Sequence, residues 1–323
     1  MKTALAMNEA RQFYHAETPA LLAMLESRRP ANGDSERWFI KKFIDSLPNM
    51  ESDDFGNRFV RIGRAPIAFS SHTDSVHHAD GFQALQVNDG VATLATGSKS
   101  NCLGADCATG VWLMRQMILA GVEGLYIFHR QEESGANGAS WIVKNNPALV
   151  EGIQAMIAFD RRGYDSIVTH QAGRETASRA FADSLAAQLN AHGFAFKPDD
   201  SGVFTDSEVY AHLIPECTNL SVGYFRQHST EESQDLEFAE SLATALPSIN
   251  WQALAIARTP CGDKWSHWLD DESYSRGSSG YGFESMRELI ETYPDAVLDI
   301  LLDHGYDFRQ LEQEIESRYG WNA

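Results

Sequence analysis

The stretch PIAFSSHTDSV, residues 66–76, is nearly continuous in apolar residues until it reaches His72 and Asp74. Such a run is typical of an interior strand that is covered on both faces. Three other apolar runs also lead into ionisable side chains: LYIFH before Glu132 and Glu133, AMIAF before Asp160, and NLSVGYF before His228. Open α/β sheets bind ligands at the carboxyl ends of their strands. The sequence therefore predicts a ligand-binding site at the edge of the sheet where these strands end.

Between these runs the sequence has helical periodicity. We expect helices over residues 18–29 and 35–47, with Ser35 as N-cap of the second, and further helices over about 106–120, 175–193 and 231–246. Strands that alternate with helices predict an α/β sandwich. The regular pattern ends near residue 255. Residues 256–281, rich in Gly, Ser and Asp, are expected to form a linker or docked loop, and residues 282–323 a small helical segment.

Composition limits the possible functions. The chain has 323 residues, 26 Lys and Arg against 45 Asp and Glu, and a formal net charge of −19. This charge disfavours binding to nucleic acid and to anionic membranes. No apolar segment typical of a signal peptide or transmembrane helix is present, and the four cysteines show no CxxC spacing. We therefore expect a cytoplasmic protein.

The residues after the apolar runs form a possible metal-ligand set. Asp106, at a loop-to-helix transition in LGADCATG, adds a fifth position to the four runs. Two histidines with several carboxylates suit Zn²⁺ or a similar ion, and their number favours two metals that share a carboxylate. Each residue alone has a simpler explanation, since a strand-ending Asp is often a helix cap and paired glutamates often lie in solvated loops. Only the combination indicates chemistry.

The motifs together resemble the co-catalytic dinuclear zinc exopeptidases, which include leucyl and glutamyl aminopeptidases and tripeptidase T. The resemblance covers about residues 18–250 and rests on FSSHTDSV, GADCATG, RQEESGANGA, AFD and FRQHSTEES. It implies a three-layer α/β sandwich with a central mixed, mostly parallel sheet and a dinuclear metallopeptidase catalytic domain over residues 1–255.

The resemblance also implies a role for each matching residue. Asp106 would bridge two divalent metals, with zinc as the expected metal, and His72 and Asp160 would bind one ion while Glu133 and His228 bind the other. Glu132 would be the general base toward a metal-activated bridging water, and Asp74 would orient the imidazole of His72.

Several positions depart from the family pattern. Cys107 replaces the second acid that many relatives have after the bridging Asp. His77 and His78 are expected in a solvated loop, with a role in gating the substrate as the alternative. Asp206 is expected to support the ligands. The interval between Asp160 and His228 is too short for an inserted dimerisation domain, so relatives with that domain are poorer models.

The leading hypothesis is an aminopeptidase that acts on short peptides. The alternative enzyme, an N-acyl amino acid deacylase or carboxypeptidase, needs a cation for the substrate carboxylate, and Arg161, Arg162, Arg174 and Arg226 are candidates. A catalytically inactive binding protein on the same fold is the third hypothesis. Expected partners are a peptide or acylated amino acid substrate and a second copy of the chain.

Overall fold

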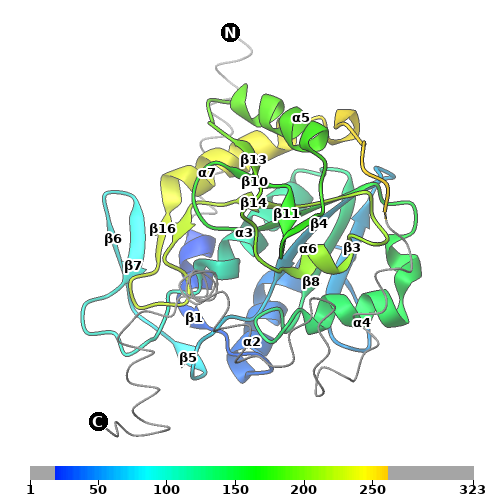
Figure 1. The fold of residues 1–323 in the computed structure, drawn as a ribbon. Helices are drawn as coiled ribbons and strands as arrows, with labels where there is room; N and C mark the ends of the chain where they lie inside the picture. Colours follow the sequence, from blue (N-terminus) through cyan, green and yellow to red (C-terminus); the bar gives the residue numbers. More distant parts are fainter. Residues whose placement is uncertain (1–18, 261–323) are drawn as a thin grey trace, which may run out of the picture. The chain divides into compact units, whose positions relative to one another are not determined.

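The computed structural model describes residues 19–260 (Figure 1). The helical segment expected over residues 282–323, and the expected linker from residue 261 onward, lie outside the described residues. Within the described part, no helix has both the length and the apolar character needed to cross a membrane.

An eight-stranded mixed sheet forms the centre of the fold, in the order β13-β10-β14-β9-β4-β8-β3-β2. Its inner strands β14, β9, β4 and β8 run parallel, while β3 and β2 pair antiparallel at one edge. The bounds are β2 Glu51–Ser52, β3 Arg58–Ile62, β4 Ile67–His72, β8 Gly124–His129, β9 Ala155–Arg161, β10 Ser166–Val168, β13 Lys197–Asp199 and β14 Glu216–Ser221. The expected central mixed sheet is confirmed.

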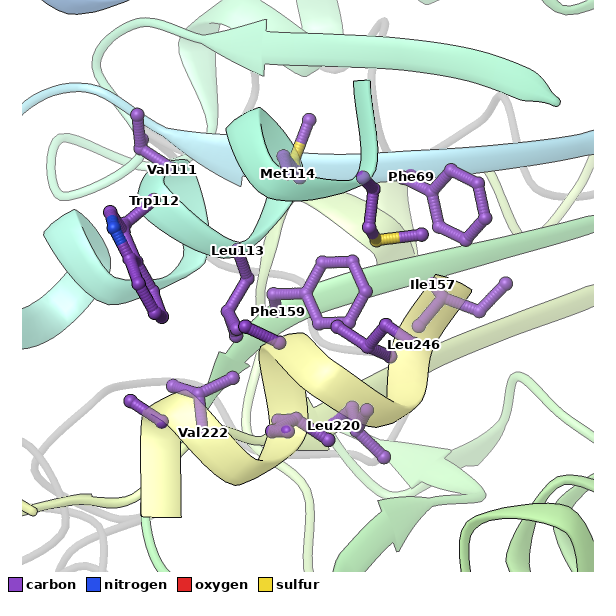
Figure 2. Packing of buried hydrophobic residues seen from close by; sticks show 14 of the residues in the cluster. Phe69, Val111, Trp112, Leu113, Met114, Ile157, Phe159, Leu220, Val222 and Leu246 are labelled. Atoms are coloured by element: carbon purple, nitrogen blue, oxygen red, sulfur yellow. The ribbon is translucent and has the colours of Figure 1, made fainter. Parts of the chain in front are cut away.

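Helices cover both faces of this sheet. Helices α3 (Ala105–Leu119) and α7 (Leu236–Ala245) pack on one face, and α4 (Asn137–Asn145) and α6 (Asp206–Val209) lie on the other. Figure 2 shows Leu113 of α3 beside Phe159 of β9, whose ring stacks on that of Phe69 of β4 with 6.0 Å between the ring centroids; all three residues are buried. Because neighbouring residues of a strand point to opposite faces, a strand packed on both faces has consecutive apolar residues, as β4 has up to Phe69 and β9 has up to Phe159. The three-layer α/β sandwich is confirmed.

The segment after β14 differs from the prediction. NLSVGYF was expected to form one strand, but β14 ends at Ser221 and the chain turns at Gly223, whose φ is +90°. Tyr224 and Phe225 then form β15, which belongs to a second, antiparallel sheet of order β15-β16-β7-β6. The other strands of this sheet are β6 Leu85–Asn88, β7 Val91–Leu94 and β16 Ser233–Asp235.

Three helix starts were also predicted wrongly, including that of α5 (Arg179–Asn190), which was expected from residue 175 and follows its N-cap Ser178. The helix expected from Glu231 begins at Leu236, because residues 233–235 pair with β7 and Asp235 caps the helix by accepting a hydrogen bond from the Phe238 N–H. Ser35 is not an N-cap: it lies inside α2 (Asp34–Phe39), which continues as the π-helix η1 (Ile40–Ile44).

The remaining elements are short or peripheral. Residues 19–25 are helical. The others are β1 Ser27–Arg28, β5 Gly81–Phe82, β11 His170–Gln171, β12 Arg174–Glu175, α5 Arg179–Asn190, η2 Pro147–Val150, η3 Leu246–Ser248 and η4 Trp251–Ala253.

Candidate metal centre

Three neighbouring parallel strands deliver ionisable residues to one edge of the central sheet. His72 is the last residue of β4, Asp160 lies near the end of β9, and Glu132 follows β8 in the next loop. The Nε2 atom of His72 lies 3.4 Å from the Asp160 carboxylate and 4.0 Å from that of Glu132. The parallel order β9-β4-β8 thus brings together residues that are far apart in the sequence.

Asp106 lies between two histidines. It enters from the first turn of α3, where its own φ and ψ are not helical. One carboxylate oxygen lies 2.9 Å from Nε2 of His72, and the other lies 3.2 Å from Nε2 of His228. The same His228 nitrogen is 3.1 Å from the Glu133 carboxylate. Each oxygen of Asp106 therefore faces a different imidazole, as expected for a carboxylate shared by two cations.

The ligand-type atoms fall into three overlapping groups, within each of which all atoms lie within 4.8 Å of one another. These groups are His72, Cys107 and Asp160; His72, Glu132 and Glu133; and Asp106, Glu133 and His228. Imidazole nitrogens and carboxylate oxygens at such separations form a donor set that suits Zn²⁺.

The electrostatics of the cluster also fit bound cations. Burial, followed by the nearby Asp106, raises the pKa of Asp160 to about 7. Burial likewise raises the pKa of Glu132, with Asp160 and Glu133 adding to the effect. Burial opposes the protonation of both histidines, but the carboxylates outweigh it and raise the pKa of His72 and His228. Without a metal, Asp160 and Glu132 therefore retain protons more readily than free carboxyls do, and divalent cations would relieve the repulsion that these two groups experience.

Asp74 connects His72 to Glu132. Its backbone carbonyl lies 3.1 Å from Nδ1 of His72, and its carboxylate lies 3.6 Å from that nitrogen. The same carboxylate oxygen accepts a hydrogen bond of 3.1 Å from the Glu132 N–H. Its other oxygen is buried and has no hydrogen-bond partner among the described residues. Asp74 thus fixes the His72 ring mainly through its main chain and the Glu132 loop through its side chain.

Cys107, which departs from the family pattern directly after Asp106, is held by contacts of its thiol. The buried Cys107 thiol donates to the Phe159 carbonyl at 3.0 Å and lies 2.7 Å from the Ser71 hydroxyl. Burial, followed by the charge of Asp160, raises the pKa of this thiol.

Asp206 contacts a different histidine. Its carboxylate lies 3.1 Å from Nδ1 of His129, whose Nε2 lies 2.8 Å from the Tyr210 hydroxyl. This group occupies the end of β8 beside His72, and the structure shows no hydrogen bond or ion pair from Asp206 to the five predicted ligands among the described residues.

The loop prediction is half right. His78 is exposed as expected, but His77 is buried, so the expected solvated loop is wrong at this position. Nδ1 of His77 accepts a hydrogen bond from the Arg29 N–H at 3.2 Å, and the Ser75 hydroxyl lies 2.6 Å from the same atom.

Three buried charged residues near the centre were missed in the sequence. Glu36 accepts a hydrogen bond of 2.7 Å from the Thr73 hydroxyl and pairs with Arg130 at 2.8 Å. Glu232 and Arg29 both bind the loop before Asp106. Glu232 lies within the motif FRQHSTEES, so its position was a usable signal, whereas Arg29 has no distinguishing sequence context.

Comparison with known proteins agrees with this architecture. No protein-family model matches the sequence, and no curated protein matches it. Solved structures do match. An aminopeptidase, PepT, from Bacillus cereus is 16% identical with a TM-score of 0.61, covering 74% of this chain and 98% of its own. A tripeptidase from Staphylococcus aureus is 14% identical with a TM-score of 0.56, covering 70% and 95%.

A third match is the TET1 peptidase of Pyrococcus horikoshii, which is 16% identical with a TM-score of 0.55 and covers 72% of this chain and 98% of its own. At these identities a likeness establishes the fold. The chain therefore has the fold that these three solved peptidases share.

Proposed function

We propose that this protein is a metal-dependent exopeptidase, and specifically an aminopeptidase that removes residues from short peptides with Glu132 as general base. The observation that carries the proposal is the position of Asp106, whose two carboxylate oxygens face His72 at 2.9 Å and His228 at 3.2 Å. A carboxylate placed in this way between two imidazoles is suited to bridge two cations.

Five residues would hold the metals. His72 and Asp160 would bind one ion, Glu133 and His228 the other, and Asp106 both. The chemistry of the donors favours zinc. Two bound divalent cations would polarise the scissile carbonyl and lower the pKa of a water molecule, so that the water can lose a proton at neutral pH. The Asp74 carbonyl beside Nδ1 of His72 favours the tautomer that leaves Nε2 free to bind a metal.

Glu132 would move the proton. Its carboxylate lies 4.0 Å from Nε2 of His72, close to the ligands, while its loop is held by Asp74. It would accept the proton of the attacking water at a carboxylate oxygen and then donate it to the amine of the leaving group.

Two of the four candidate arginines pair with acids of the chain itself, which favours a free amine over a carboxylate as the recognised end of the substrate. A deacylase or carboxypeptidase would hold the substrate carboxylate with a cation. Arg161 instead pairs with Asp199 at 3.0 Å, and Arg226 pairs with Glu231 at 2.6 Å. The net charge of −19 further favours a cationic amine near the site. The deacylase remains the alternative enzyme.

The names of the structural neighbours point the same way, since they include an aminopeptidase and a tripeptidase. The Pyrococcus peptidase is described as assembling into a tetrahedron or an octahedral shell. We extend this to self-association of the present chain as part of the proposal.

The test compares free and blocked substrates. Zinc-loaded protein is assayed with aminoacyl anilides and dipeptides and with their N-acetylated forms, before and after dialysis against a chelator. We expect kcat/KM to fall by roughly tenfold or more on acetylation, because a charged hydrogen-bonding group is lost, and activity to vanish on chelation. Faster cleavage of the acetylated substrates would replace the aminopeptidase with the deacylase, and chelator-resistant activity would refute metal dependence.

A further inference from the structure

Two buried residues of opposite charge bind the loop that leads into Asp106. The carboxylate of Glu232 accepts hydrogen bonds from the N–H groups of Leu103 and Gly104, both at 2.8 Å, on one oxygen. Its other oxygen accepts from the Asp106 N–H at 3.1 Å. Glu232 is 1% exposed, so its charge is offset by these three donors rather than by water. One side chain therefore satisfies three backbone donors of the loop.

Arg29 binds the same loop at the backbone carbonyl of Gly104. Its guanidinium is fully buried and donates to the Gly104 carbonyl at 2.7 Å and to the Thr73 carbonyl at 3.0 Å. It also donates to the carbonyls of Met24 and Ser27. No carboxylate of the described residues forms an ion pair with it, so carbonyl oxygens solvate the charge. Arg29 thus ties the loop before Asp106 to the residue that follows His72.

Gly104 is fixed at both its N–H and its carbonyl by these two residues. Its φ of +76° is in the left-handed region, and a Cβ at this position would lie 2.7 Å from the His77 ring. The loop consequently has one close-fitting path between Arg29 and Glu232. Because Asp106 lies two residues further on, that path sets where its carboxylate emerges.

Each of the two residues also belongs to another ligand segment. Glu232 follows His228 by four positions, and its N–H donates to the Ser229 carbonyl at 3.1 Å. Arg29 contacts Thr73, directly after His72. The segments that carry His72, Asp106 and His228 are therefore joined through two side chains that are not themselves among the predicted ligands.

We propose that Arg29 and Glu232 form a clamp that positions the Asp106 carboxylate between His72 and His228, and so sets the affinity for two metals. This inference rests on the proposed function, because it presupposes the dinuclear site. Three N–H groups converge on Glu232, and a carboxylate can accept from all of them. A glutamine would turn an NH₂ group toward at least one donor and release part of the loop.

Glu216 provides a matched control. It begins β14, whereas the metal centre lies at the carboxyl ends of the strands. It is also buried, and its carboxylate accepts hydrogen bonds from the N–H groups of Ser178 at 2.6 Å, Ala257 at 2.7 Å and Arg258 at 2.9 Å. Glu216 and Glu232 are thus chemically alike, so either substitution should lower the stability of the fold. They differ in their position relative to the predicted ligands, so only the substitution of Glu232 should affect metal binding.

The experiment measures Co²⁺ and Zn²⁺ binding to the full chain by titration calorimetry and by the cobalt absorption spectrum, at a temperature where each variant is folded by circular dichroism. We expect Glu232→Gln to lower the affinity for the metal ion that binds second in the titration by at least tenfold, and to alter the cobalt absorption spectrum. Glu216→Gln should lower the melting temperature but bind both metals as the wild type does.

Wild-type affinities and spectrum in Glu232→Gln, or equal losses of metal in both variants, would overturn the clamp. If Glu232→Gln does not fold, Arg29→Lys provides the same test from the other side, because lysine keeps the charge but cannot reach both carbonyls as a fork. Wild-type binding of both metals by Arg29→Lys would then overturn the proposal. Because no substrate is used, a wild-type protein that binds two metals but cleaves no peptide would refute the proposed activity and not the clamp.

Discussion

His72 and His77 lie five residues apart, and both are buried, yet the structure gives them opposite surroundings. Nε2 of His72 faces three carboxylates, the closest being Asp106 at 2.9 Å. Nδ1 of His77 faces the Arg29 N–H, and its Nε2 lies 3.1 Å from the Cys102 carbonyl. The first ring belongs to an anionic cluster, and the second belongs to a network of neutral hydrogen bonds beside a buried guanidinium.

The pKa values of the two rings shift in opposite directions. Burial, followed by the charge of Arg29, lowers the pKa of His77 to about 3, so this ring stays neutral and structural. Burial also opposes the protonation of His72, but Asp160 and the other nearby acids outweigh it and raise its pKa. The comparison shows that burial alone does not decide the chemistry of a histidine. A ring surrounded by carboxylates occupies a place where a cation is stable.

The largest effect is expected at the bridging carboxylate. Asp106→Asn should remove most of the affinity for both metals and with it all activity, because each ion would lose a charged ligand. Metal content by mass spectrometry after zinc saturation checks this result. Asp206→Asn is the control, since Asp206 faces His129 rather than a predicted ligand and should leave two zinc equivalents. A single equivalent in the saturated wild type would contradict the dinuclear site.

A smaller effect is expected next to the ligands. Glu132→Gln should keep both metals but lower kcat by roughly 10²- to 10⁴-fold, because the general base is lost while the fold and ligands remain. Glu133→Gln is the matched neighbour, and it should lose metal because Glu133 contacts His228. Metal content measured together with steady-state kinetics after zinc saturation distinguishes the loss of the general base from the loss of a metal ligand. Near-normal turnover by Glu132→Gln would remove Glu132 from the mechanism.

The smallest effect concerns the other histidine. The pKa of His77 is lowered in the folded protein to about 3 from 6.5, so the unfolded chain binds more protons between these values. Stability should therefore fall as pH decreases through this window, by roughly 1 kcal/mol from this group at pH 5.5. His77→Asn, which keeps an acceptor for the Arg29 N–H, should make the pH profile flatter by that amount. Urea unfolding at pH 7.5 and 5.5 measures it.

The control for this last prediction is His78→Asn, since His78 is exposed and its replacement should leave the pH profile unchanged. Equal profiles for wild type and His77→Asn would show that His77 does not remain neutral in the folded protein, and the comparison with His72 would lose its basis.

Local sequence patterns predicted much of the fold. β4, β8 and β9 lie within one residue of the apolar runs that indicated them, and α3 lies within one residue of the expected helix. The prediction failed where the local pattern and the pairing of strands favour different structures. The run NLSVGYF is divided between two sheets at Gly223, and residues 233–235, which were expected to be helical, form β16. Strand partners come from distant segments, so periodicity along the chain cannot reveal such divisions.

The apolar runs and the residues that follow them were enough to predict which side chains meet at the candidate metal centre, because parallel strands place the side chains after their carboxyl ends at one edge of the sheet. How these side chains are held depends on contacts that form only in the folded chain. The hydrogen bonds of Glu232 and Arg29 to the loop before Asp106, and the partners that keep His77 neutral, join segments distant in the chain. Their donors and acceptors are backbone groups that every residue carries, so no residue type or spacing marks them in advance.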